Sequence, residues 1–214
     1  MNLHGAIEFL NDYPEMSFGP IRNGELNLRG TFKFRASYDG GPIIEDSYEL
    51  QILVPKGFPY ELPKVTELEG KIPRDGSYHV NPDDTLCVGS PLRVLLKLQE
   101  LLTMNTFAEE CLVPYLYAVS YKLKNGGNFI FGELEHGIKG IFNDYGEILG
   151  LTNPKQVAKA LSLLSMKKRV ANKKTCPCEC GKRLGACDFH IKLNSLRTVA
   201  PRSFYRKHLY ELYR

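Results

Sequence analysis

The sequence predicts an α+β protein, in which an antiparallel meander of strands with flanking helices is followed by a helical extension and a small cysteine-rich module. Segments 26–38 and 42–55 alternate apolar and polar residues on either side of Asp39-Gly40-Gly41, which is a hairpin-turn signal. Segment 107–123 instead repeats its apolar residues at helical spacing. We therefore expect an antiparallel sheet with a helix packed on it.

The other elements of the first 125 residues follow from local signals. Leu3–Asn11 has the apolar spacing of an opening helix. Prolines at positions 55, 59 and 63 precede a short strand at 64–68. Two helices are expected over 92–102 and 107–123, and Cys111, inside the second of them, is expected to belong to the core.

The C-terminal region is expected to be separate and helical. Asn153 caps a predicted helix that has Pro154 at its first position and continues to about Val170. A basic linker, Ala171–Thr175, then leads into the cysteine-rich module at 175–190. We accordingly divide the chain into a domain at 1–150 and an extension at 151–214.

Composition favours a cytoplasmic protein. With 214 residues, 43% of them hydrophobic, the chain can build one core and an appendage. It has no apolar stretch long enough to span a bilayer, and its N-terminus lacks the basic and long apolar regions of a signal peptide. We therefore expect no membrane partner.

The formal charge of +4 conceals two regions of opposite sign. Residues 151–214 hold 15 Lys+Arg and 3 Asp+Glu, a net of +12, which leaves 13 and 21 in residues 1–150, a net of −8. The basic region is either a solvated cationic face or a docking surface for an acidic partner or a nucleic acid. Because no aromatic-rich basic groove or DNA-reading helix accompanies it, a protein partner is favoured over nucleic acid.

One short loop holds the residues best suited to chemistry. Residues 78–91 read YHVNPDDTLCVGSP and contain His79, Asn81 and Cys87. A thiol attacks as its thiolate, so a working cysteine calls for exposure and polar neighbours. The Asn81 amide offers N–H donors for an oxyanion, and His79 is suited to bracing the loop or to acting as a base.

The surrounding order of elements resembles the ubiquitin-conjugating enzymes of the UBC fold over roughly residues 1–125. The likeness lies in the strand YELQILVP, the FPxxxP turn, a second strand, a His-x-Asn loop and a cysteine followed by a long helix. It implies that Cys87 carries a ubiquitin-like protein as a thioester, that Asn81 attends the oxyanion and that His79 is the motif histidine. Val80 stands where the family has a proline of fixed φ, and the interval from Asn81 to Cys87 is about two residues shorter.

A glycine-rich segment at 125–141 contains Glu133 and His136. It resembles a GE-x-x-HG segment of bacterial UBC-like proteins, and glycines permit close backbone approach. The alternative is a glycine turn with a solvated carboxylate and imidazole. If the fold returns His136 to Cys87, this histidine is suited to deprotonating an incoming amine or the thiol.

Four cysteines lie between residues 176 and 187, a crowding typical of metal ligands rather than of disulfides. Thiolates suit Zn(II) in tetrahedral coordination. The segment TCPCECGKRLGACDFH resembles the zinc motif at the C-terminus of the SecA translocation ATPase. That resemblance implies Cys176, Cys178 and Cys187 as three of the ligands.

The fourth zinc ligand is left open between two residues. Asp188 stands where the SecA motif has Cys or His, so either Cys180 or His190 completes the site. His190 is slightly favoured, because three thiolates of a C-x-C-x-C run would crowd one turn. We expect the zinc to be structural, since so small a module has little core of its own.

Together these features predict a ubiquitin-like conjugating enzyme that transfers a protein C-terminal glycyl group from Cys87 to an amine. The chain has no nucleotide-binding signature, so a separate activating partner must supply the acyl group. It resembles the stand-alone conjugating proteins of CBASS antiphage operons, which implies a cGAS/DncV-like nucleotidyltransferase C-terminus as acyl donor. A catalytically silent UBC-like binding protein and a deconjugating cysteine peptidase are the alternatives.

Overall fold

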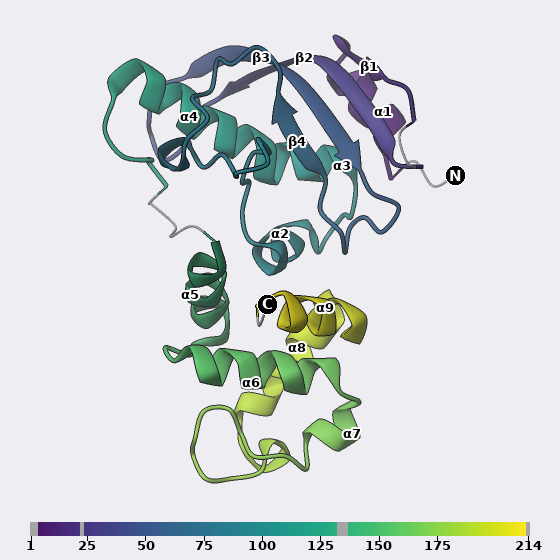
Figure 1. The fold of residues 1–214 in the computed structure, drawn as a ribbon, viewed down its shortest axis with the longest axis vertical. Coiled ribbons are helices and arrows are strands. Elements are labelled where there is room, and N and C mark those ends of the chain that lie inside the picture. Colours follow the sequence, from purple (N-terminus) through teal and green to yellow (C-terminus); the bar gives the residue numbers. More distant parts are fainter. Residues whose placement is uncertain (1–3, 22–23, 132–136, 213–214) are drawn as a thin grey trace. The chain divides into compact units, whose positions relative to one another are not determined.

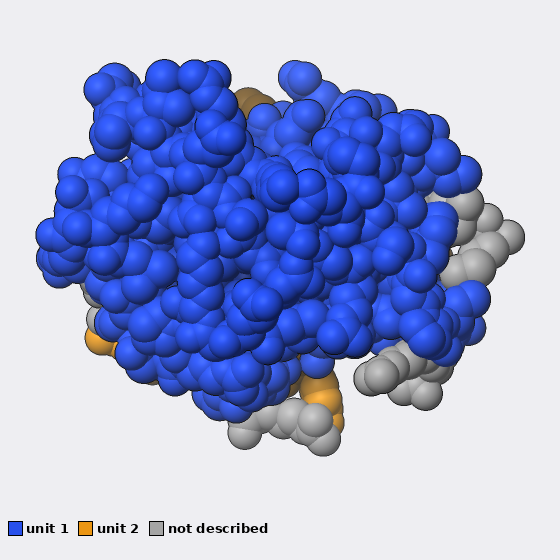
Figure 2. Space-filling view, turned by 90° about the horizontal axis from the view of Figure 1, so that it is seen from above, with its two compact units in different colours: residues 1–133 blue, residues 134–214 orange. Residues whose placement is uncertain are grey.

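The computed structural model describes residues 4–21, 24–131 and 137–212. The chain forms two compact units, residues 1–133 and 134–214 (Figure 2). The predicted α+β class is confirmed, with a four-stranded antiparallel sheet, flanking helices and a cysteine cluster near the C-terminus. Among the described residues, no helix combines the length and the apolar character needed to cross a bilayer.

The sheet is a meander in which every neighbouring pair is antiparallel (Figure 1). Helix α1 (Ala6–Asp12) comes first in the chain. Four strands follow it, which are β1 (Met16–Phe18), β2 (Leu26–Ala36), β3 (Ile44–Val54) and β4 (Lys64–Glu67). The predicted hairpin is confirmed, since β2 and β3 pair without interruption from Leu26↔Val54 to Ala36↔Ile44. Strand β1 was not predicted, because three residues are too few to show an alternating pattern.

Helix α4 (Val113–Asn125) lies across one face of the sheet (Figure 1). Side chains of alternate strand residues are buried beneath it, among them Phe32, Leu50 and Ile52. The Tyr48 hydroxyl on β3 lies 2.6 Å from the Ser120 hydroxyl of α4, so a buried polar contact also joins helix and sheet. The core of the first unit therefore lies between the sheet and α4.

The helical run before α4 is distorted at a proline. Helix α2 (Pro91–Leu98) is shorter than predicted, α3 (Met104–Phe107) follows it, and residues Ala108–Leu112 form a π-helical turn before α4. Pro114 has no N–H for the carbonyl of Glu110, four residues earlier. The Lys97 amine donates to that carbonyl at 2.8 Å instead. Cys111 is buried in this turn, which confirms its predicted place in the core.

The second unit is helical. Its α-helices are α5 (Gly137–Leu149), α6 (Pro154–Ser165), α7 (Lys168–Ala171), α8 (Phe189–Val199) and α9 (Arg202–Leu212), and a short 3₁₀ turn spans Leu184–Ala186. The predicted cap is confirmed, because the Asn153 side chain accepts the Lys155 N–H at 2.9 Å. Buried residues of α6 and α9, including Leu161 and Tyr205, form its core.

Two sequence-based boundaries in this region differ from the structure. The predicted helix to Val170 ends at Ser165, where the Arg197 guanidinium donates to the carbonyls of Leu163, Leu164 and Met166 and so satisfies the helix end. The units divide after residue 133 rather than after 150, because α5 packs on α6. A Cβ at Gly146 of α5 would lie 3.6 Å from a methyl carbon of Val157 in α6, which is ordinary packing distance.

Candidate functional site

The structure brings His79, Asn81 and Cys87 into one small hairpin. The Cys87 N–H donates to the His79 carbonyl at 2.8 Å, and the Asn81 N–H donates to the Thr85 carbonyl at 2.8 Å. Between these pairs Val80 bridges Leu86, whose side chain is buried in the core. The Leu86 N–H also donates to the Val65 carbonyl of β4 at 2.7 Å, so the hairpin is fixed to the sheet.

The Cys87 thiol is half-buried, which corrects the expectation of an exposed thiol among polar groups. Burial raises the pKa of Cys87 above its ordinary value, and a hydrogen bond from the Gly89 N–H opposes that rise. Gly89 has a φ of 134°, a backbone conformation that favours glycine. At neutral pH the thiol is therefore mainly protonated, and the Gly89 N–H is placed to stabilise its ionised form.

Asn81 lies diagonally across the hairpin from Cys87, because the Val80–Leu86 pair separates the Asn81–Thr85 pair from the His79–Cys87 pair. Such a diagonal separates Cα atoms by about 7–8 Å, within reach of a long side chain. The Asn81 amide is directed to Thr85, because its Nδ2 donates to the Thr85 hydroxyl at 3.0 Å. That hydroxyl donates in turn to Asp83 at 2.6 Å. One of the two amide N–H groups thus orders the turn of the hairpin.

His79 is only 7% exposed and is held in place by aromatic packing. Its ring packs against the ring of Phe129 in a T-shaped arrangement, with ring centroids 4.6 Å apart. Two residues of α4 hold the preceding turn η1 (Gly76–Tyr78), since the Tyr115 hydroxyl donates to the Tyr78 carbonyl at 2.8 Å and the Lys122 amine donates to the Ser77 carbonyl at 2.7 Å. Of the two predicted roles for His79, bracing the hairpin fits this packing.

The segment after α4 returns to this hairpin through Phe129, which is 8% exposed. Sequence reasoning singled out Glu133 and His136 in this segment, and both lie outside the described residues. It did not single out Phe129, Tyr115 or Lys122. The available signal was the segment GGNFIF, in which two glycines and an asparagine indicate a turn and Phe129 follows as an apolar anchor.

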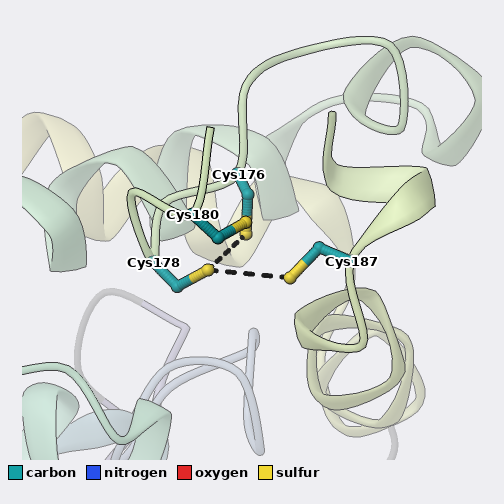
Figure 3. Close-up of side chains that lie close together, drawn as sticks. All are labelled: Cys176, Cys178, Cys180 and Cys187. Atoms are coloured by element: carbon teal, nitrogen blue, oxygen red, sulfur yellow. Dashed lines mark hydrogen bonds between the residues drawn. The ribbon is translucent and has the colours of Figure 1, made fainter. Parts of the chain in front are cut away.

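The second candidate site is a cluster of four cysteines in the C-terminal unit (Figure 3). The Sγ atoms of Cys176, Cys178, Cys180 and Cys187 all lie within 4.8 Å of one another. The Cys176 and Cys178 sulfurs are 3.0 Å apart, and those of Cys178 and Cys187 are 3.6 Å apart. Sulfurs at the corners of a zinc tetrahedron with bonds of about 2.3 Å would be about 3.8 Å apart. The cluster is therefore able to hold a metal ion and is compatible with zinc.

The fourth member of this cluster is Cys180 rather than His190, which corrects the preference drawn from the sequence. His190 lies at the start of α8, and its Nδ1 is 2.7 Å from the Cys187 carbonyl oxygen. Glu179, between two of the cysteines, has a φ of 61°. This left-handed residue turns the chain sharply, so a C-x-C-x-C run can direct three thiols to one point.

Electrostatics within the cluster favour at least one thiolate. A hydrogen bond from Cys176 lowers the pKa of Cys178 to about 7. The Cys176 thiol has the opposite shift, because burial raises its pKa. The Lys159 amine donates to the Cys176 carbonyl at 3.1 Å, so one cation contacts the backbone of the cluster.

The protein therefore has two candidate sites. One is Cys87 in a hairpin that is anchored to the core, and the other is a cluster of four cysteines that is able to hold a metal ion. Comparisons with protein-family models, with curated proteins and with solved structures found no match.

Proposed function

We propose that this chain is a ubiquitin-like conjugating enzyme of the UBC fold, with Cys87 as the residue that carries the acyl group. The support is the element order: α1, the meander β1 to β4, a hairpin with His79, Asn81 and Cys87, and then α2 and α4. The single observation that carries the proposal is that hairpin, because it joins the three residues of the family's motif although their spacing is altered.

In the loading step the Cys87 sulfur attacks the carbonyl carbon of an activated C-terminal glycyl group. A C–S bond forms, the donor's leaving group departs with the bonding electron pair, and the thiol proton passes to solvent or to the donor complex. In the transfer step an amine nitrogen attacks the thioester carbonyl. The C–S bond breaks, Cys87 leaves as thiolate, and the amine gives up a proton.

The environment of Cys87 suits a carrier of acyl groups. A thiol of raised pKa forms a more basic thiolate, which is a poorer leaving group, so its thioester is more resistant to water. The Gly89 N–H, already directed at the sulfur, stabilises negative charge there when the thioester is cleaved. Asn81 is the side-chain candidate for the oxyanion, once its amide leaves Thr85.

The donor and the setting follow from the resemblance to CBASS conjugating proteins. A cytoplasmic activating partner supplies the acyl group, which is a ubiquitin-like protein or the C-terminus of a cGAS/DncV-like nucleotidyltransferase. The four thiols of the C-terminal unit bind one structural Zn(II), because the region around them has little core apart from α6 and α9.

A second candidate function is supported by one observation. The half-buried Cys87 thiol of raised pKa is also what a silent UBC-like binding protein would retain, since nothing there requires a reactive thiolate. The two functions differ in whether an acyl group is ever found on Cys87.

The test is to isolate the chain from its native cells and to map adducts by mass spectrometry. We expect a protein adduct on Cys87 that thiols release, and Cys87→Lys should replace it with an amide that thiols do not release. Cys111→Ala is the matched control, because that cysteine is buried in the core. An adduct that persists in Cys87→Ala would rule out the proposed carrier, and absence of any adduct in the unaltered protein would favour the silent binder.

A further inference from the structure

The surface around α7 and the cysteine cluster is densely cationic. Seven exposed residues of the span 167–183 carry positive charge, and Glu179 is the one acidic residue in that span. They are Lys167, Lys168, Arg169, Lys173, Lys174, Lys182 and Arg183. We call this set the basic face. None of the seven forms an ion pair within the part of the chain that the structure describes.

Backbone pairing gathers these residues into one surface. The Leu184 N–H donates to the Lys174 carbonyl at 2.8 Å, and the Cys176 N–H donates to the Lys182 carbonyl at 2.9 Å. Between them Thr175 bridges Arg183. The predicted basic linker, Ala171–Thr175, therefore begins in the last residue of α7 and ends in a single β-bridge, and α7 contributes Lys168 and Arg169. Two cationic stretches that are separate in sequence therefore lie side by side.

Neutralising the cysteine cluster does not account for this charge. Four thiolates around Zn(II) carry two negative charges, so that even with Glu179 the cations remain in excess. The lysine whose amine contacts the cluster backbone also lies outside the basic face, since Lys159 donates to the Cys176 carbonyl. Like charges held together without anions repel one another, and an external anionic partner would relieve that repulsion.

The chemistry of this surface fits an acidic protein better than a nucleic acid. Residues 167–183 contain no aromatic side chain on which a base could stack, and α7 is only four residues long, too short to read a groove. Val170, which follows Arg169 in α7, is 43% exposed. An apolar contact surrounded by charge is characteristic of protein interfaces.

We propose that the basic face binds an acidic segment of another protein, with Val170 as its apolar contact. The complementary charges would steer the partner and fix its orientation, and the apolar contact would add to the affinity. This interaction is independent of the thioester chemistry at Cys87, so it stands whether or not the chain is a conjugating enzyme.

The test uses the full-length, zinc-loaded chain and fluorescence anisotropy with two probes, a labelled polyglutamate peptide and a short duplex DNA. The variant Lys168→Gln/Arg169→Gln/Lys173→Gln/Lys174→Gln removes four charges of the basic face. Its matched control, Lys155→Gln/Lys192→Gln/Arg202→Gln/Arg206→Gln, removes four exposed charges elsewhere in the same unit. Circular dichroism and zinc content establish that both variants are folded.

We expect the basic-face variant to lose about tenfold or more of its affinity for polyglutamate and the control to lose about twofold or less. A peptide in which leucines alternate with the glutamates should bind more tightly than polyglutamate, and Val170→Ser should remove that gain. Equal losses in the two variants would overturn the proposal. So would the absence of polyglutamate binding, or tighter binding of duplex DNA through the same side chains.

Discussion

The two cysteine sites use the same side chain in opposite surroundings. Cys87 is one thiol set against a hydrophobic core, where burial raises its pKa and only the Gly89 N–H favours the thiolate. Cys178 lies among three other thiols near the surface, where a hydrogen bond from Cys176 lowers its pKa to about 7. The comparison teaches that a cysteine's role follows from its neighbours. The proposed acyl carrier is the isolated thiol of the core-anchored hairpin, whereas the four clustered thiols lie close enough together to hold a metal ion.

The largest effect should come from removing the metal. A chelator, or Cys176→Ser, should unfold the region after about residue 175, because structural zinc contributes about 10 kcal/mol or more to small domains of this kind. The first unit should keep its own core and its Cys87 hairpin. Elemental analysis and hydrogen exchange resolved along the chain measure both.

His190→Ala provides the matched control for that experiment. It should retain about one zinc per chain, since the cluster is formed by four cysteines. Loss of zinc in His190→Ala together with its retention in Cys180→Ala would show that the sequence-based preference for His190 was correct.

The next effect concerns the packing that braces the Cys87 hairpin. Phe129→Ala should destabilise the first unit by about 3 kcal/mol, because it removes a buried ring from His79. Phe131→Ala is the control. That ring is 45% exposed and contacts Tyr38, so its loss should cost about 1 kcal/mol. Urea unfolding gives the energies, and exchange of the Cys87 amide hydrogen reports the hairpin itself. Similar values for both variants would mean that Phe129 does not brace the site.

A smaller effect is expected on the rate of acyl transfer when Asn81, the proposed oxyanion donor, is replaced. Asn81→Ala should slow transfer from a loaded Cys87 by about 100-fold, at the low end for an oxyanion donor, because the amide is directed to Thr85. Single-turnover discharge of the isolated thioester measures this step. Thr85→Val, which frees the amide from that hydroxyl, should discharge at least as fast as the unaltered protein. Unchanged discharge in Asn81→Ala would remove Asn81 from the mechanism.

The smallest effect is expected on the reactivity of Cys87 when the hydrogen bond from the Gly89 N–H is weakened. Gly89 has a φ of 134°, so Gly89→Ala should strain the backbone and weaken the hydrogen bond that lowers the pKa of Cys87. Alkylation of Cys87 at neutral pH should therefore slow by about threefold, as the loss of one modest hydrogen bond implies. Gly40→Ala, at another glycine of positive φ, controls for strain and should leave the rate unchanged. A faster reaction in Gly89→Ala would show that this hydrogen bond does not stabilise the thiolate.

The sequence was a good guide wherever local signals decide the structure. Alternating residues and Asp39-Gly40-Gly41 define the β2 to β3 hairpin, and Asn153 with Pro154 defines the start of α6. The end of α6 was mispredicted, because Arg197, more than 30 residues away in sequence, caps it. No periodic pattern contains such a contact.

In the candidate sites, too, the sequence predicted which residues come together but not how their side chains are directed. Spacing alone predicted that four cysteines gather, but the choice between Cys180 and His190 depended on the left-handed turn at Glu179. Likewise the sequence placed Asn81 near Cys87, whereas the direction of its amide depended on Thr85. Both details rest on backbone angles and on side-chain contacts that residue types do not specify.

Thiol-by-thiol alkylation of the native, zinc-loaded protein, read by mass spectrometry, tests the central claim that Cys87 is the working thiol and the four clustered cysteines are metal ligands. Cys87 should react first, with a rate that rises as pH increases beyond the ordinary thiol value, because its pKa is raised. Cys111 should resist, since it is buried, and the four clustered thiols should resist until a chelator is added. Labelling of Cys176, Cys178, Cys180 and Cys187 at the same rate with and without chelator, or a Cys87 that does not react in the folded protein, would contradict the claim.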